Sequence, residues 1–154
     1  MSVNCGRPWR LRGFAGHGGA WRRSGCAGHA VVEEQAASLA WVLPGLVGNG
    51  GFEAWIESLG QRTPEAVAGL RLMGADAYAA LLEQVAWLFP TGGAADADTR
   101  LSAMDAWGDR EVSQLDQLTR QFLELQQAHD LEERFVAPFV RAHPRQFPLR
   151  VEDL

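Results

Sequence analysis

With 154 residues, the chain is long enough for one domain with a hydrophobic core and too short for two. Apolar residues make up 47% of it, and no uninterrupted apolar run approaches the roughly 18 residues of a membrane span. The N-terminus carries arginines without the apolar segment of a signal peptide, and both cysteines, Cys5 and Cys26, lie near that end. We therefore predict a cytoplasmic protein with reduced thiols and no membrane association.

Charge is divided unevenly along the chain. Residues 1–30 hold five of the 14 arginines and no acid, so the remaining chain sets nine arginines against all 19 acids, a net charge of −10. A domain with this charge repels nucleic acid. We expect no direct nucleic-acid binding and a neutral or basic protein as the partner.

Residues 1–30 are rich in glycine and show neither strand alternation nor a helical period. Such a segment buries too little apolar area to offset its ordering entropy, so we predict a flexible, disordered arm. Cys5, His17, Cys26 and His29 raise the alternative of a zinc site. The gap between the two cysteines is far longer than the roughly two to four residues usual within a zinc knuckle, so we expect no metal and no cofactor.

From residue 31 onward, apolar residues recur at helical spacing. A first stripe covers residues 32–43 and is expected to end before Pro44, because proline removes a backbone donor. A second stripe covers residues 52–59. Between them lies the sequence Asn49-Gly50-Gly51-Phe52, in which two glycines precede a well-patterned helix.

These glycines have two interpretations. A phosphate-binding loop needs a strand before the glycines and usually a lysine, and this chain has no lysine. We therefore predict a structural corner at Asn49, Gly50, Gly51 and Phe52, with the glycines at positive φ. The corner would let Phe52 and Trp55 pack on Leu39 and Leu43.

Five further helices are predicted over residues 63–73, 76–89, 101–107, 113–125 and 131–142. Side chains that commonly cap helices mark four of the starts, and a glycine marks one end: Thr63, Asp76, Ser113, Asp130 and Gly74. Pro138 should kink the last helix. Because no segment alternates as a strand does, the fold class is all-α, a single compact domain of about seven helices over residues 31–154.

Four segments of this domain resemble the DNA mimic protein 19 family: NGGFEAWIESLG, AGLRLMGADAYAALLEQ, LDQLTRQFLEL and VRAHPRQF. The family pattern places an Asn-Gly-Gly-Phe corner before a helix and then an apolar-Gly-Ala step, here Met73, Gly74 and Ala75. The resemblance covers roughly residues 32–147. It implies a small helical bacterial domain and, for function, carboxylates spaced like DNA phosphates that occupy the DNA-binding face of a transcription factor.

Acidic residues are concentrated between residues 96 and 116. Surface carboxylates can substitute for a phosphate ladder on a basic groove, and such binding depends strongly on salt. The alternative is a solvated helix face with helix caps, and Arg100 and Arg110 could pair with these acids. A homodimer would extend the acidic track. The candidate partner-binding residues are Asp96, Asp98, Asp105, Asp109, Glu111 and Asp116, with Asp130, Glu132 and Glu133 as a second group.

Support for catalysis is slight. His129 and His143 lie at predicted helix ends, where a histidine commonly interacts with the helix dipole, and no nucleophile is placed beside His129 and Asp130. Four tryptophans fall in helical segments and are expected in the core: Trp41, Trp55, Trp87 and Trp107. We therefore predict a non-catalytic acidic interaction module. An immunity or antitoxin-type domain that binds through an apolar groove is the alternative, and a small enzyme is a third.

Overall fold

The computed structural model describes residues 30–89 and 96–147. These residues form six α-helices and no strand, which confirms the all-α class. The helices are α1 (Ala30–Leu59), α2 (Thr63–Leu72), α3 (Asp76–Trp87), α4 (Ala97–Asp105), α5 (Asp109–Ala128) and α6 (Ala137–Ala142), with a 3-10 helix at Gly60–Arg62 and a π turn at Glu132–Val136. The predicted disordered arm, with its alternative zinc ligands, lies outside the described residues.

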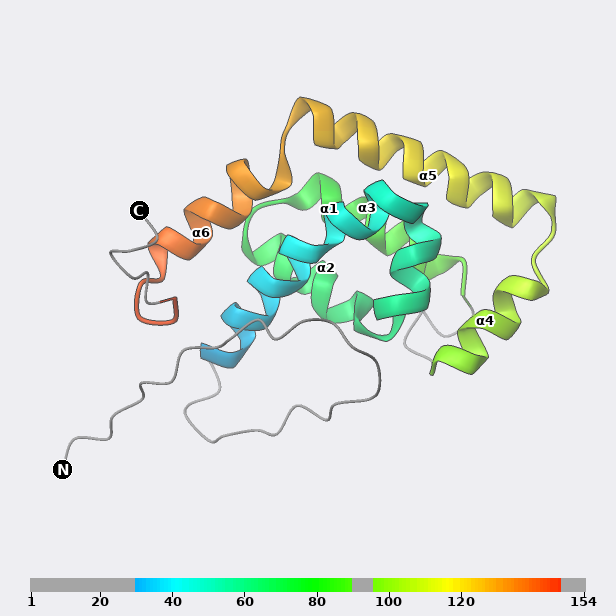
Figure 1. Ribbon diagram of the computed structural model, residues 1–154, viewed down its shortest axis with the longest axis horizontal. Coiled ribbons are helices and arrows are strands. Elements are labelled where there is room, and N and C mark those ends of the chain that lie inside the picture. Colours follow the sequence, from blue (N-terminus) through cyan, green and yellow to red (C-terminus); the bar gives the residue numbers. More distant parts are fainter. Residues whose placement is uncertain (1–29, 90–95, 148–154) are drawn as a thin grey trace.

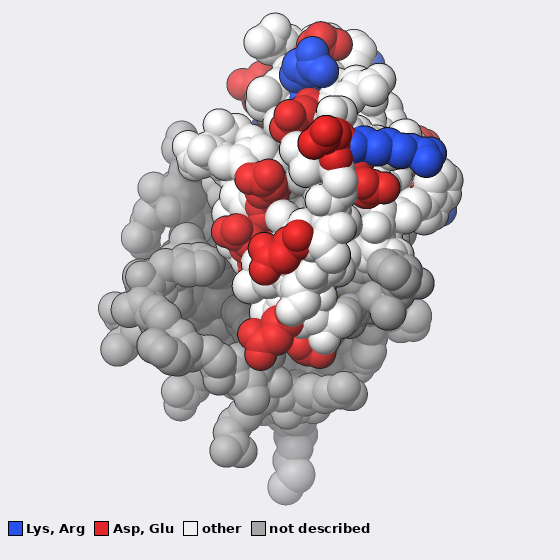
Figure 2. Space-filling view, turned by 90° about the vertical axis from the view of Figure 1, so that its right-hand side faces the viewer, with Lys and Arg blue, Asp and Glu red and all other residues white. Residues whose placement is uncertain are grey.

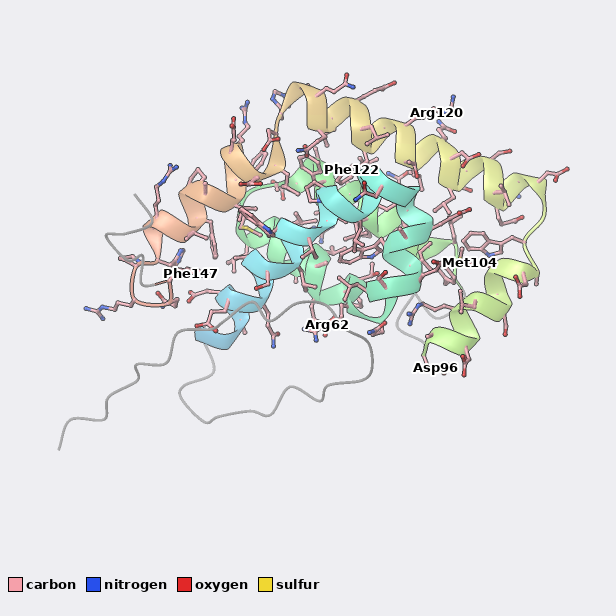
Figure 3. The ribbon with its side chains drawn as sticks, in the orientation of Figure 1. Arg62, Asp96, Met104, Arg120, Phe122 and Phe147 are labelled. Atoms are coloured by element: carbon pink, nitrogen blue, oxygen red, sulfur yellow. The ribbon has the colours of Figure 1, made fainter. Side chains whose placement is uncertain are left out.

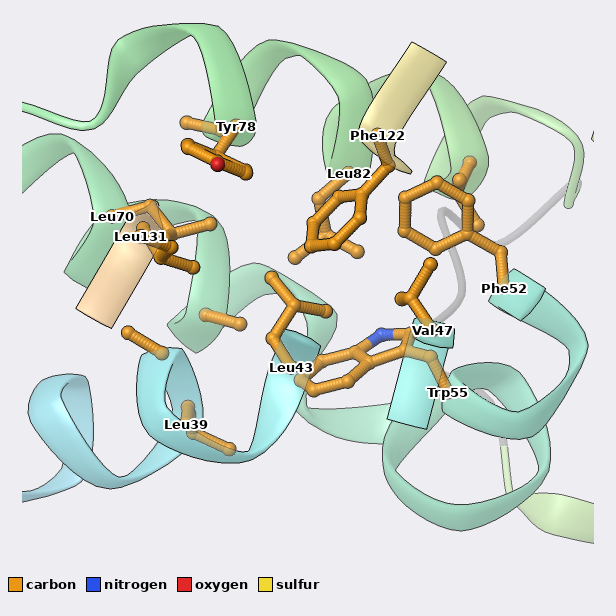
Figure 4. Packing of buried hydrophobic residues seen from close by; sticks show 14 of the residues in the cluster. Leu39, Leu43, Val47, Phe52, Trp55, Leu70, Tyr78, Leu82, Phe122 and Leu131 are labelled. Atoms are coloured by element: carbon orange, nitrogen blue, oxygen red, sulfur yellow. The ribbon is translucent and has the colours of Figure 1, made fainter. Parts of the chain in front are cut away.

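The helices pack around one core. Helices α1, α2 and α3 form the centre, α5 lies along one side of them, and α4 and α6 lie toward opposite ends of α5 (Figure 1). Buried apolar side chains of α1, α2, α3 and α5 join those of the segment after α5 in a single cluster. Figure 4 shows its centre, where Phe122 of α5 approaches Phe52 and Leu82.

Helix α1 does not end before Pro44, contrary to the sequence prediction. It continues past the proline, and its non-helical backbone comes at Gly50 and Gly51. The two expected helices therefore meet at a kink inside α1, and together they count as one of the six helices where about seven were expected. Leu43 and Val47, on either side of the proline, are 0% and 1% exposed. Burying this inward stripe offsets the hydrogen bond that proline cannot donate.

The predicted corner lies at this break. Gly51 has a φ of +66°, as predicted, whereas Gly50 has a φ of −149°, so the positive φ predicted there is wrong. The backbone N–H of Phe52 donates to the hydroxyl of Thr119 on α5 at 3.1 Å, so another helix supplies the cap for the second half of α1. Asn49 is exposed. The residues predicted to pack here are all buried in the core cluster: Leu39, Leu43, Phe52 and Trp55.

Replacing Gly51 with valine is expected to lower the free energy of unfolding by about 1–3 kcal/mol, because a β-branched residue is strained at positive φ. A Cβ there would also lie 3.3 Å from the Thr119 hydroxyl that receives the Phe52 N–H. Urea denaturation followed by tryptophan fluorescence measures the loss. Gly48→Val is the matched control, since nothing lies within 4 Å of its Cβ position. Equal losses in the two variants would contradict a strained corner.

Two residues predicted to cap helices do not cap them. Helix α2 begins at Thr63, but its hydroxyl donates to the Gly60 carbonyl at 2.7 Å and accepts the indole N–H of Trp55 at 3.0 Å. This buried hydroxyl therefore satisfies the indole N–H rather than the start of α2. Asp76 is the first residue of α3 and makes no capping hydrogen bond.

Helix α5 starts four residues before the predicted Ser113. It begins at Asp109, where the Glu111 carboxylate accepts the Gly108 N–H at 3.0 Å. This bond uses a donor that a helix start leaves unsatisfied. Ser113 and Asp116 are exposed inside the helix, so the helix start predicted at Ser113 is wrong.

Two predicted helix boundaries are confirmed. Gly74 has a φ of +79°, its N–H bonds to the Arg71 carbonyl, and the next N–H bonds to the Leu70 carbonyl, the pattern of a glycine-terminated helix. Asp130 accepts the Glu133 N–H at 2.9 Å and so caps the last helical segment. The π turn comes just before Pro138, the residue at which the sequence predicts a kink.

Candidate acidic interaction face

Asp96 caps the start of α4. Its carboxylate accepts both the backbone N–H of Thr99 at 3.0 Å and the Thr99 hydroxyl at 2.9 Å. The backbone bond, followed by the hydroxyl bond, lowers the pKa of Asp96 from its ordinary value. Asp98 and Asp105 are exposed on the same helix. Figure 3 shows Asp96 at the end of α4 that lies farthest from α5.

The remaining three predicted acids lie on α5. Asp109 and Glu111 occupy its first turn, where the helix dipole favours negative charge. Glu111 is half-buried and bonds to Gly108, whereas Asp109 and Asp116 are exposed. Of the six predicted acids, two therefore cap helices. The other four make no hydrogen bond or ion pair within the described residues: Asp98, Asp105, Asp109 and Asp116.

The structure adds Glu53 and Glu57, which the sequence analysis did not single out. They are exposed and four residues apart on the second half of α1, so they share a side of that helix. Their neighbours bond to the two acid-bearing helices: the N–H of Phe52 to α5, and the carbonyl of Ile56 to α4. This half of α1 therefore lies between α4 and α5.

Figure 2 views the end of the molecule where α4 and the start of α5 lie. Carboxylates, in red, run down this view in a band. The arginine side chains, in blue, lie in the upper half of the view. At this end lie the acids of the second half of α1, of α4 with its cap, and of the first half of α5. We call these acids the acidic face: Glu53, Glu57, Asp96, Asp98, Asp105, Asp109, Glu111 and Asp116. The second predicted group lies elsewhere, beyond the other end of α5, where Asp130 already serves as a cap.

Arg100 does not lie on this surface, although the sequence suggested that it would pair with the surface acids. It is 2% exposed, and its Nε donates to the carbonyl of Ile56 at 3.0 Å. Burial lowers the pKa of Arg100, and the charge of Asp96 acts in the opposite direction. Arg110 is exposed and forms no ion pair with a described acid. Neither arginine therefore covers the exposed acids.

The two histidines of the described region lie in separate places. The Nδ1 atom of His129 is 2.9 Å from a guanidinium nitrogen of Arg134, and that of His143 donates to the Phe139 carbonyl at 2.7 Å. The described residues contain no group of three or more His, Cys, Asp or Glu side chains that could hold a metal ion. No helix in the described part of the chain is long and apolar enough to cross a membrane.

An apolar groove lies between α2 and α3. Its walls include Pro64, Val67 and Trp87, and an ion pair of 2.7 Å between Arg71 and Glu83 crosses it. Trp87 is 72% exposed and Trp41 is 57% exposed, so the expectation that both lie in the core is wrong. Trp55 is buried as expected, and Trp107 is half-buried against Phe89. Helical position alone did not distinguish the inward tryptophans from the outward ones.

Comparison with known proteins gives one match. The model of a family described as DMP19-like protein matches residues 32–143. No match was found among curated proteins or among solved structures. The matched range contains the corner, all of α2 to α5 and every residue of the acidic face.

Proposed function

Because the chain belongs to the DMP19-like protein family, we propose that it is a non-catalytic interaction module and a DNA mimic. In this proposal the acidic face occupies the DNA-binding face of a basic bacterial protein such as a transcription factor, within the cytoplasm. The observation that carries the proposal is the gathering of exposed carboxylates from α1, α4 and α5 on one surface. Of the two arginines between residues 96 and 116, Arg100 is buried beneath this surface and Arg110 forms no ion pair with a described acid.

The chemistry of the face agrees with such a partner. A DNA-binding surface carries Lys and Arg side chains that neutralise phosphates, and carboxylates can take the place of those phosphates. Six of the eight acids of the face have no intramolecular partner among the described residues, so their charges remain available. At physiological salt, charges interact over about 8 Å, so neighbouring carboxylates of the face act together. A homodimer would extend this field further.

Binding through the acidic face should depend steeply on salt. Capture of a basic partner by the immobilised full chain is expected to fall at least tenfold between about 50 and 200 mM salt, because exposed charges are screened. Mass spectrometry of the captured protein identifies the partner. Retention of the same partner across this range would contradict the proposal.

The α2–α3 groove supports the alternative, an interaction domain of the immunity or antitoxin type. Binding through this groove would resist salt, because apolar contacts are not screened. Trp87→Ala separates the two functions, since it removes the most exposed apolar side chain of the groove and leaves the acidic face unchanged. Loss of capture in this variant, with little dependence on salt, would favour the alternative.

A further inference from the structure

We propose that Arg100 is a positioning residue that holds α4 against the end of α1, and thereby decides whether the acids of α4 belong to the acidic face. The inference rests on the proposed function, because it concerns the surface that would bind the partner.

Helix α4 has little apolar attachment. Arg100 is its only buried residue, Ala103 and Met104 are half-buried against the core, and Leu101 is 40% exposed. Helix α5, in contrast, buries three large apolar side chains: Leu115, Leu118 and Phe122. A helix with few buried apolar contacts opens at low free-energy cost, so α4 can leave the domain while the core stays folded.

The Arg100 contact is built into the end of α1. Ile56 is among the last four residues of that helix, whose carbonyls lack helical partners, and α1 has no basic residue of its own in its last turn. The guanidinium of Arg100 brings both a donor and a positive charge to this end, where the helix dipole is negative. One side chain of α4 therefore satisfies the end of α1.

Gly60 provides the space for this side chain. A Cβ at Gly60 would lie 2.8 Å from Cδ of Arg100 and would also overlap Nε, the atom that bonds to Ile56. Gly60 is itself buried and directly follows α1. Any larger residue at this position must displace Arg100, so the contact can be disturbed without changing α4.

The consequence concerns the acidic face. Asp98 and Asp105 lie on α4 on either side of Arg100, whereas Glu57 follows Ile56 on α1. With Arg100 in place, its hydrogen bond to Ile56 ties the helix that carries Asp98 and Asp105 to the helix that carries Glu57. Once Arg100 is displaced, the acids of α4 move independently of Glu53 and Glu57, and the face loses its fixed spacing.

Two variants of the full chain test this role from opposite sides of the contact. Gly60→Ala displaces Arg100, and Arg100→Lys removes the Nε donor while keeping the positive charge. Hydrogen exchange is expected to show at least a tenfold loss of protection for the amides of α4, with those of α5 unchanged. Affinity for an octa-arginine peptide, measured by fluorescence anisotropy at low salt, should fall about threefold or more. Gly48→Ala is the control, since its Cβ would meet open space.

The outcomes separate the two proposals. Full protection of α4 in both variants would overturn the role of Arg100, and so would lost protection with unchanged peptide affinity. Failure of the wild-type chain to bind octa-arginine would instead overturn the proposed function. In that case the exchange of α4 amides still decides whether Arg100 holds the helix.

Discussion

Replacing Phe122 with alanine is expected to lower the free energy of unfolding by about 3–5 kcal/mol, because the change leaves a cavity in the core. Phe122 is 0% exposed, and its ring meets those of Phe52 and Tyr78 edge to face, with centroids 5.5 and 5.2 Å apart. These rings come from α5, α1 and α3, so the substitution loosens three helices at once (Figure 4). Urea denaturation followed by far-UV circular dichroism measures the loss.

The neighbouring residue provides the control. Leu123 is on the same helix but is 37% exposed, so Leu123→Ala is expected to change stability by only about half a kcal/mol. Both variants remove apolar atoms from α5, and only one removes them from the core. A loss for Phe122→Ala no larger than that for Leu123→Ala would contradict its place at the junction of three helices.

Periodicity predicted the core well because burial in a helical protein repeats with the turn of the helix. The stripe that holds Leu39 and Leu43 lies inward as expected. The rule that a proline ends a helix failed at Pro44, where burial on both sides of the proline outweighs the hydrogen bond that it cannot donate. Capping signals were less reliable, since a hydroxyl such as that of Thr63 bonds to whichever partner the tertiary fold places nearest.

The candidate site was predictable only in part. The acids between residues 96 and 116 could be predicted as a cluster because they are close together in the sequence. The apolar stripe of Phe52 and Trp55 also indicates that Glu53 lies on the outward side of its helix. Glu53 belongs to the acidic face only because α1 packs between α4 and α5. Those contacts join residues far apart in the sequence, so a local pattern does not predict them. Arg100 was misplaced for the same reason, because its hydrogen bond joins residues 44 positions apart.

Neutralising four unpaired acids of the acidic face, those on α4 and α5, is expected to weaken partner capture strongly while leaving the fold intact. The variant replaces Asp98, Asp105, Asp109 and Asp116 with asparagine, and it spares Asp96 and Glu111 because both cap helices. Removing exposed charges changes stability by less than about half a kcal/mol each, so binding can be measured on a folded protein. Capture of the partner at low salt is expected to fall at least tenfold.

A second quadruple variant distinguishes the face from overall charge. Changing Glu34, Glu124, Glu132 and Glu133 to glutamine removes four negative charges from exposed positions toward the α6 end of the molecule. If net charge alone attracts the basic partner, both variants lose affinity equally, because long-range attraction depends on total charge. If the carboxylates of the acidic face stand in for phosphates, only the first variant loses it. Wild-type affinity in the first variant would reduce the family relationship to one of fold alone.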